Sequence, residues 1–266
     1  MTALLDHLER GRASGRKLLV PYVMGGIPDR GAFPSVLAAV EEHADALEIG
    51  LPYSDPLMDG PAIADAGQRA IAQGVGPFEA LELAARERDR PGAPRLAMTY
   101  YNPIHRVGEA RFCGCAAAAG FAGLIVPDIP LEESGSLRGA AAAEGLAWIP
   151  LVAPTSSPER VAAIVAAATG FVYAVSTLGV TGTRESLSSR AAGVVARCRA
   201  ATDAPVLVGV GVSTPEQAVE ATESADGVVI GSAIVRLTLD EGPAAAGAFV
   251  GDVRRALDRS GMPAGR

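Results

Sequence analysis

Eight short apolar runs constrain the fold of this chain more than any other feature of its sequence. They are rich in β-branched residues and do not alternate apolar with polar positions, which is typical of strands covered on both faces, as in parallel sheets. We therefore expect a parallel sheet. In chain order the runs are LLVPYVM from Leu18, ALEIG from Ala46, LAMTYY from Leu96, GLIVPD from Gly123, AWIPLV from Ala147, FVYAVS from Phe171, PVLVGVG from Pro205 and GVVIGS from Gly227.

Helical patterns fill the gaps between these runs. In TSSPERVAAIVAAATG, Ser157 can cap a helix that begins at Pro158 and ends at Gly170. In STPEQAVEAT, Thr214 and Gln217 have the spacing of a capping box. Strand and helix in alternation predict a parallel α/β protein, and eight such units in 266 residues match a (β/α)8 TIM barrel. The alternative, a doubly wound open sheet, predicts G-x-G-x-x-G after the first strand, and VMGGIPDRG lacks that order.

The spacing of the runs indicates one domain with an insertion. No linker or low-complexity stretch divides the chain, so we expect residues 1–266 to form a single barrel domain. About 50 residues separate the starts of the second and third runs, at Ala46 and Leu96, more than between the other neighbours. This gap contains PAIADAGQRAIAQG, which predicts an additional helix after the second strand. Because long loops at the carboxyl ends of barrel strands carry chemistry, the insertion indicates the active-site face.

Charge and composition argue against several other classes of protein. The chain has 23 basic and 30 acidic residues and a net charge of −7, which disfavours a general nucleic-acid binder. Cys113, Cys115 and Cys198 have neither zinc nor redox spacing, and the three histidines form no metal-binding pair. The sequence lacks a signal-peptide run and any segment near the roughly 20 apolar residues of a membrane span. We therefore expect a cytoplasmic protein that binds no metal and no membrane.

Glycine-rich turns follow the last three strands. They are LGVTGTR (178–184), GVGVSTPE (209–216) and IGSAIV (230–235). Glycine lets backbone N–H groups approach an anion closely, and a helix that starts after the turn adds the positive end of its dipole. Barrels often bind phosphate at their last two strands and a short extra helix, here a helix that begins at Ser232. We predict a phosphate site, although the glycines alone are also compatible with ordinary tight turns.

Two carboxylates in LEIGLPYSDPLMDGP are candidates for catalysis. If Leu47 and Ile49 face the helices, Glu48 points into the barrel, where burial raises its pKa and allows proton exchange near neutral pH. The alternative is a structural carboxyl group paired with a polar partner. Asp59 lies on the following loop, from which it can meet a ligand. Asp128, in VPDIPLEES, is expected to cap the next helix.

These segments together resemble the tryptophan synthase alpha subunit family. LEIGLPYSDPLMDGP resembles the family's signature segment, and MTYYNPI, GLIVPDIPLEES, LVAPTSS, YAVSTLGVTGTR, VGVGVSTPEQ and GVVIGSAIV follow in its order and spacing. The likeness covers nearly the whole chain from Leu18 onward. It implies cleavage of indole-3-glycerol phosphate to indole and glyceraldehyde 3-phosphate, a retro-aldol reaction without a cofactor. It also implies a beta subunit as partner, in an α2β2 tetramer.

The resemblance assigns roles to individual residues. Glu48 matches the acid/base that protonates carbon 3 of indole, and Asp59 matches the aspartate that holds the indole N–H group. The matched substrate-binding positions are Tyr22 and Tyr173 beside the ring, Thr181 on a closing loop, and Gly182, Gly211, Gly231 and Ser232 at the phosphate. The chain departs from the family's usual residues at Tyr22, where phenylalanine is common, and at Met24, Thr177 and Val210.

Three other functions stay open on the residues alone. A standalone lyase that releases free indole would share the catalytic pair and would be fast without a partner. An inactive paralogue that only binds or regulates a beta subunit is disfavoured because both Glu48 and Asp59 are present. Another phosphate-binding barrel, such as an isomerase, would explain the glycine turns but not the two carboxylates.

Overall fold

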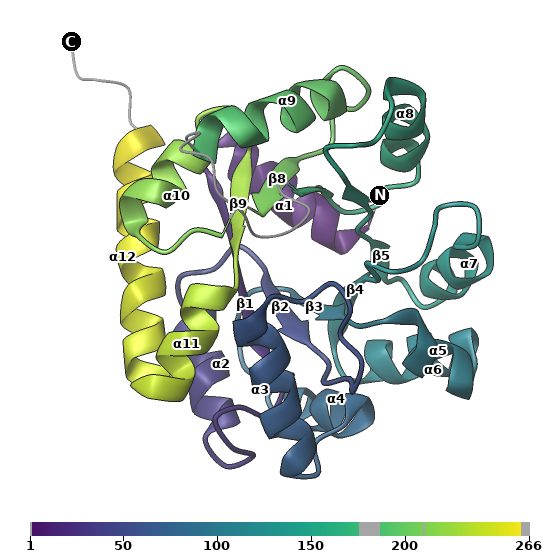
Figure 1. The fold of residues 1–266 in the computed structure, drawn as a ribbon, viewed down its shortest axis with the longest axis vertical. Helices are drawn as coiled ribbons and strands as arrows, with labels where there is room; N and C mark the ends of the chain where they lie inside the picture. The colour runs from purple at the N-terminus through teal and green to yellow at the C-terminus, as the bar shows by residue number, and fades with distance from the viewer. Residues whose placement is uncertain (1, 176–186, 210, 262–266) are drawn as a thin grey trace.

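The computed structural model describes residues 2–175, 187–209 and 211–261, in which parallel strands are surrounded by helices (Figure 1). The strands are β1 (Leu18–Met24), β2 (Leu47–Gly50), β3 (Arg95–Met98), β4 (Phe121–Ile125), β5 (Ala147–Trp148), β6 (Leu151–Val152), β7 (Val172–Val175), β8 (Val206–Gly209) and β9 (Gly227–Ile230). The helices are α1 (Ala3–Ala13), α2 (Phe33–Glu41), α3 (Pro61–Ala72), α4 (Pro77–Ala85), α5 (Tyr101–Val107), α6 (Glu109–Ala118), α7 (Gly135–Ala143), α8 (Pro158–Ala166), α9 (Leu187–Arg199), α10 (Pro215–Ala221), α11 (Ser232–Asp240) and α12 (Pro243–Gly261). Each of the eight apolar runs forms strand, and the predicted barrel is confirmed.

The fifth run closes the barrel, although Pro150 divides it into two short strands. β5 pairs with β4 and β6 pairs with β7, so the sheet order is β5-β4-β3-β2-β1-β9-β8-β7-β6. Between the two halves, the Ile149 N–H donates to the Leu124 carbonyl at 3.0 Å, and the Tyr173 N–H donates to the Pro150 carbonyl at 3.0 Å. Proline has no N–H to donate, which interrupts the ladder. The continuous segment still bonds to both of its neighbours.

Alternation along the strands separates the buried residues into two sets. The larger set lies mainly between the strands and the helices and includes Leu47 and Ile49. The other fills the barrel, and Leu4 and Leu8 of α1, which contacts β1 and β4, belong to it. α1 therefore covers the end of the barrel where the strands begin, which leaves the carboxyl ends as the open end of the interior. The other members of the interior set lie in the strands or immediately beside them: Leu18, Val20, Ala46, Leu96, Ile125, Ala147, Ile149, Phe171, Leu207 and Val229.

Most of the helices and helix caps that the sequence predicts are present in the structure. Ser157 caps α8 and Thr214 caps α10, and each side chain accepts a hydrogen bond from the N–H three residues on. α8 stops at Ala166 and does not reach Gly170, because the next backbone N–H groups close short turns. The additional helix predicted after the second strand is α3, and α4 follows it before β3 begins.

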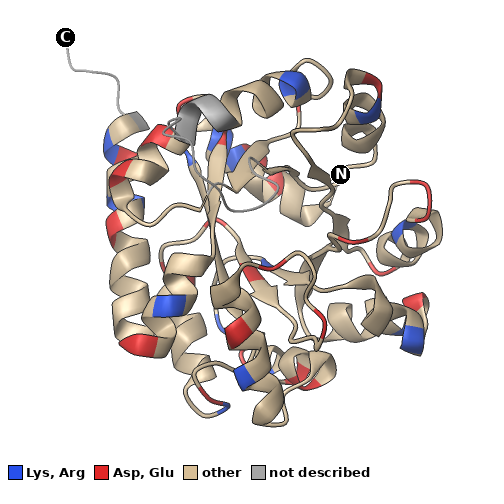
Figure 2. Cartoon of the chain, viewed as in Figure 1, with Lys and Arg blue, Asp and Glu red and all other residues tan. Residues whose placement is uncertain are grey.

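Charged side chains lie on the outer helices and loops, with acidic and basic residues interspersed (Figure 2). Two buried ion pairs link the starts of the strands to the helical ring: Arg95 of β3 bonds to Glu41, and Arg254 of α12 bonds to Asp45. These pairs lie at the strand ends opposite the expected site. Within the described part of the chain, no helix is both long and apolar enough to cross a membrane.

Candidate active site

Glu48 of β2 lies inside the barrel. It is 1% exposed, and the register places it beside Tyr22 of β1 and Leu96 of β3. Its sequence neighbours Leu47 and Ile49 pack toward the helices, as the alternation requires. Among the described residues, no group forms a hydrogen bond with its Oε2 atom. The carboxyl group therefore lacks, on that oxygen, the partner that a purely structural glutamate would have.

The two candidate carboxyl groups differ in their pKa values. Burial raises the pKa of Glu48 from 4.5 to about 8, and the negative charge of Asp59 adds to this shift. Burial also raises the pKa of Asp59 from 3.8 to about 6, although a hydrogen bond with the Tyr100 hydroxyl opposes it. Near pH 7, Glu48 is mostly protonated and Asp59 is mostly ionised. Such a separation allows one carboxyl group to act as an acid while the other carries negative charge.

Two tyrosine rings flank Glu48. Burial raises the pKa of the Tyr22 phenol, with smaller contributions from Asp59 and Glu48, and burial and Glu48 raise the pKa of Tyr173. Two glycines leave room for these rings. A Cβ atom on Gly50 would lie 1.9 Å from the Tyr22 hydroxyl oxygen, and one on Gly209 would lie 2.6 Å from a ring carbon of Tyr173. The ring positions therefore require glycine at the ends of β2 and β8.

Asp59 lies on the loop between β2 and α3 and is partly buried. Tyr100, which immediately precedes α5, holds this loop, because its hydroxyl accepts a hydrogen bond from the Met58 N–H at 3.0 Å and also bonds to Asp59. Sequence reasoning missed Tyr100. The available signal was its position in MTYYNPI, at the carboxyl end of the third strand, where barrel sites are built.

The residues predicted to bind phosphate come after β8 and β9. Gly211 has a φ of 65°, in the left-handed region that favours glycine. Gly231 is the N-cap of α11 and Ser232 is its first residue, so the unpaired N–H groups of this helix begin directly after β9. Four other positions singled out in the sequence lie outside the described residues: Thr177, Thr181, Gly182 and Val210.

Asp128 does not cap the helix that follows it. Its carboxylate accepts a hydrogen bond at 2.9 Å from the N–H of Tyr101, the first residue of α5. It therefore caps a helix that precedes it in the chain. The reason is the sheet order: β3 and β4 are adjacent, so the loop after β4 reaches the helix that follows β3.

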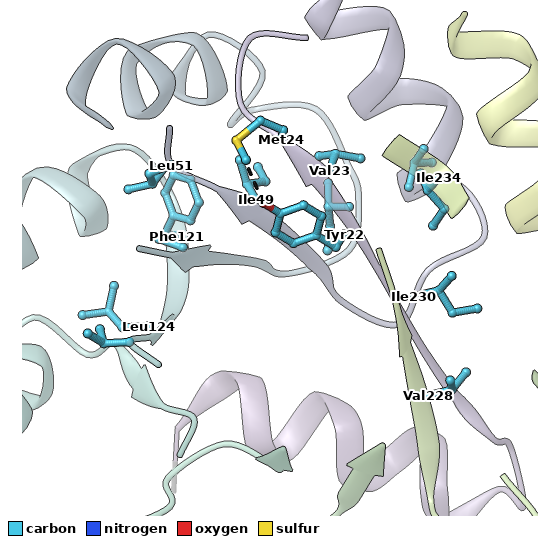
Figure 3. Packing of buried hydrophobic residues seen from close by; sticks show 14 of the residues in the cluster. Tyr22, Val23, Met24, Ile49, Leu51, Phe121, Leu124, Val228, Ile230 and Ile234 are labelled. Atoms are coloured by element: carbon cyan, nitrogen blue, oxygen red, sulfur yellow. Dashed lines mark hydrogen bonds between the residues drawn. The ribbon is translucent and has the colours of Figure 1, made fainter. Parts of the chain in front are cut away.

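Two cavities lie at the carboxyl ends of the strands. A small one, of about 10 Å³, is lined by residues that include Tyr22, Met24, Gly67 and Asp59. Figure 3 shows Tyr22 and Met24 side by side at the end of β1, with the tyrosine hydroxyl directed at the methionine sulfur. A larger cavity, of about 520 Å³, runs along the loops after β4 and β6 and has a volume typical of small-molecule sites.

These features define the class of protein. It is a (β/α)8 barrel that carries a buried, protonated carboxyl group on one strand and an ionised carboxylate on the loop after that strand. Glycine turns and a helix N-terminus follow two neighbouring strands of the same sheet. Within the described ranges, no group of three or more His, Cys, Asp or Glu residues is placed to hold a metal ion.

Comparisons with known proteins identify the family. The family model described as tryptophan synthase alpha chain matches residues 8–248. The tryptophan synthase alpha chain of Streptomyces avermitilis is 45% identical over 245 residues, 92% of this chain and 88% of the relative. That of Synechococcus elongatus is 43% identical over 261 residues, 97% of this chain and 98% of the relative. The chain belongs to the tryptophan synthase alpha chain family.

Solved structures agree with this assignment. A chain of Mycobacterium tuberculosis tryptophan synthase is similar with a TM-score of 0.89 at 40% identity, over 96% of this chain and 98% of that chain. Tryptophan synthase subunit alpha from Legionella pneumophila is similar with a TM-score of 0.89 at 31% identity, over 97% of this chain and 99% of that chain. The fold is therefore shared along essentially the whole length.

Proposed function

We propose that this chain cleaves indole-3-glycerol phosphate to indole and glyceraldehyde 3-phosphate as the alpha subunit of tryptophan synthase. Membership of the family over nearly the whole chain supports this reaction. The observation that carries the proposal is the environment of Glu48, a carboxyl group inside the barrel whose pKa is raised to about 8. The reaction needs an acid of this kind, because its first event is protonation of a carbon atom.

Glu48 acts first as the acid and then as the base. Proton transfer from its carboxyl group to carbon 3 of indole makes that carbon tetrahedral and leaves positive charge on the ring nitrogen. The Glu48 carboxylate then accepts the proton of the glycerol hydroxyl beside the bond to be broken. The O–H electrons form the aldehyde carbonyl, and the electrons of the broken carbon–carbon bond restore the aromatic ring. One proton is given and one is recovered, so the step needs no cofactor.

Asp59 stabilises the charge that develops on the ring. Its carboxylate, ionised near pH 7, accepts a hydrogen bond from the indole N–H. This bond strengthens as the ring becomes positive, which lowers the energy of the transition state more than that of the bound substrate. Tyr100 keeps the carboxylate in place, since its hydroxyl bonds to both Asp59 and the Met58 backbone.

The other predicted site residues that the structure describes bind the two ends of the substrate. Tyr22 and Tyr173 provide aromatic surface for the indole ring. Gly211, Gly231 and Ser232 hold the phosphate, with the start of α11 supplying unpaired N–H groups and a positive dipole end. Each of these interactions binds substrate and transition state alike, so they govern KM more than kcat.

A beta subunit is the proposed partner, in an α2β2 tetramer. Leu57 and Met58 are the exposed large hydrophobic residues of the described chain, at 89% and 52%, and they share a loop with Asp59. A partner that covers this loop would bury apolar surface and hold a catalytic residue at the same time. We expect faster indole release when a beta subunit is added. A fast rate that the beta subunit leaves unchanged would favour the standalone lyase.

The experiment that tests the reaction is cleavage by Glu48→Gln. The amide keeps the shape of the carboxyl group but cannot donate and recover the proton, so we expect kcat to fall by on the order of a hundred- to ten-thousand-fold. The matched control is Glu42→Gln, at the exposed position that directly follows α2, which should keep the wild-type kcat. A Glu48→Gln enzyme with most of its activity would contradict the assignment.

A further inference from the structure

The small cavity beside Asp59 is lined by residues of the strand ends, of the loop that carries Asp59, and of α3. Its lining includes Tyr22 of β1, Ile63 and Gly67 of α3, and Asp59 of the loop between β2 and α3. Its volume of about 10 Å³ corresponds to roughly one water-sized probe, so it can take one small group but not a second ring.

The cavity lies on one particular side of the catalytic pair. Asp59 and Tyr100 line it, whereas Glu48 is not among the described residues of its wall. In the proposed reaction, which this inference presupposes, Asp59 holds the ring nitrogen and Glu48 faces carbon 3. On the side away from carbon 3, the ring nitrogen is bonded to the fusion carbon 7a, and the next atom, carbon 7, is the nearest position of the six-membered ring that can carry a substituent. A substituent on that carbon points past Asp59, toward the cavity.

Met24 and Tyr22 set the size and polarity of this space. The Tyr22 hydroxyl is buried and its described partner is the Met24 sulfur, at 3.9 Å, which is a weak acceptor. Methionine is flexible and fills irregular gaps, so its side chain can yield to a small group. On the opposite wall, a Cβ atom on Gly67 would lie 3.4 Å from the Met24 methyl carbon and would narrow the cavity without a clash.

We propose that this cavity is a subsite for a small substituent, such as fluorine, methyl or hydroxyl, at position 7 of the indole ring, and that Met24 and Gly67 determine the size it accepts. The chain is therefore expected to cleave 7-substituted indole-3-glycerol phosphates that a filled wall would exclude. A hydroxyl or fluorine substituent gains an additional donor in Tyr22. Substituents at position 5, on the far side of the six-membered ring, do not enter this cavity.

The test compares kcat/KM for the unsubstituted, 7-methyl and 5-methyl substrates in three enzymes. Wild type should cleave the 7-methyl substrate with kcat/KM within about tenfold of the unsubstituted one, because the added methyl group fits. Gly67→Ala should lower the ratio of 7-methyl to unsubstituted kcat/KM by about tenfold, and leave the 5-methyl ratio at its wild-type value. Gly139→Ala, on an exposed helix position where the new Cβ touches nothing, should leave both ratios unchanged.

A variant that enlarges the cavity, and does not narrow it, completes the test. Met24→Ala should raise the relative kcat/KM of a 7-ethyl substrate by about tenfold over wild type, and not that of a 5-ethyl substrate. If the two isomers respond alike to both variants, or if the 7-substituted ratio does not move, the subsite is refuted. If wild type fails to cleave even the unsubstituted substrate, the proposed reaction is wrong. In that case, calorimetry measures the affinity of 7-methylindole and 5-methylindole for wild type and for Gly67→Ala. Weaker binding of 7-methylindole alone to Gly67→Ala would support the subsite, and an equal change for both isomers would refute it.

Discussion

The two ends of the barrel interior are built from the same strands but differ in chemistry. At the end where the strands begin, Leu18, Phe171 and Leu207 pack with Leu4 and Leu8 of α1 in an entirely apolar cluster. At the other end, further along β1, β2 and β7, the interior positions are Tyr22, Glu48 and Tyr173. Both ends are buried, yet among the interior residues that the structure describes, only those at the carboxyl ends of the strands include groups whose charge changes with pH.

This difference shows how one scaffold serves two purposes. The apolar end contributes stability, because each fully buried side chain adds on the order of 1.5–3 kcal/mol. The polar end lowers stability at high pH, because ionising a buried carboxyl group without a close partner is costly. The apolar packing at one end thus offsets the cost of a buried carboxyl group at the other. Mutations at the two ends should therefore have opposite effects on stability.

The largest effect on stability is expected from Glu48→Gln. Folded Glu48 has a pKa of about 8 against 4.5 in the unfolded chain, so the folded state holds the extra proton and its free energy of unfolding falls as pH rises through this window. Glutamine does not titrate. We expect the variant to exceed wild type by roughly 3–5 kcal/mol near pH 9 and to equal it near pH 4, by urea unfolding. A difference independent of pH would contradict this account.

Leu8→Ala tests the packing at the apolar end of the barrel interior. Leu8 is fully buried beneath the strands, so its truncation leaves a cavity and should cost about 2–5 kcal/mol of unfolding free energy at every pH. Under conditions where the variant is folded, its kcat should match wild type, since no catalytic group moves. Loss of kcat together with retained stability would show that the two ends are not separable in this way.

Gly50→Ala tests the close approach that positions Tyr22. The added Cβ would lie 1.9 Å from the tyrosine hydroxyl, so the ring must move, at a cost of about 1–3 kcal/mol. Tyr22→Phe in the same chain removes the nearest atom and should recover part of this loss. Unfolding measurements on the two single variants and the double variant give the coupling free energy between positions 50 and 22. Strict additivity would mean that the contact does not constrain the ring.

The smallest of these effects is electrostatic. Asp59→Asn removes the negative charge that contributes to the raised pKa of Glu48, so that pKa should fall. It should stay above 4.5, because burial is the larger cause and is unaffected. The carboxyl resonance of Glu48, followed by NMR during a pH titration of the variant, measures the change. A higher pKa in the variant would mean that the two carboxyl groups do not interact as described.

Much of this architecture could be predicted from sequence because it depends on local patterns. The strand positions followed from the eight apolar runs, the caps Ser157 and Thr214 from their spacing, and α3 from the length of one gap. The inward direction of Glu48 followed from strand alternation. That residues 1–266 form one domain, and that the protein is cytoplasmic, stay predictions.

The contacts that sequence reasoning missed join residues far apart in the chain. Tyr100 reaches Met58 and Asp59 from another strand, and Asp128 reaches the start of α5 across two neighbouring strand ends. No pattern within a window of sequence encodes such pairs. The proximity of Met24 and Gly67 is a further example, because these two residues lie on β1 and α3 and are more than 40 positions apart in the chain.

The central claim is that Glu48 is a neutral acid at physiological pH, and its direct titration tests this most simply. With carboxyl-labelled glutamate, and Glu48→Gln used to assign the resonance, we predict a midpoint near pH 8 for this one group in the free protein. The other glutamates serve as internal references. A Glu48 midpoint near 4.5, the ordinary value for glutamate, would mean that it is ionised at neutral pH and cannot supply the proton on which the proposed reaction depends.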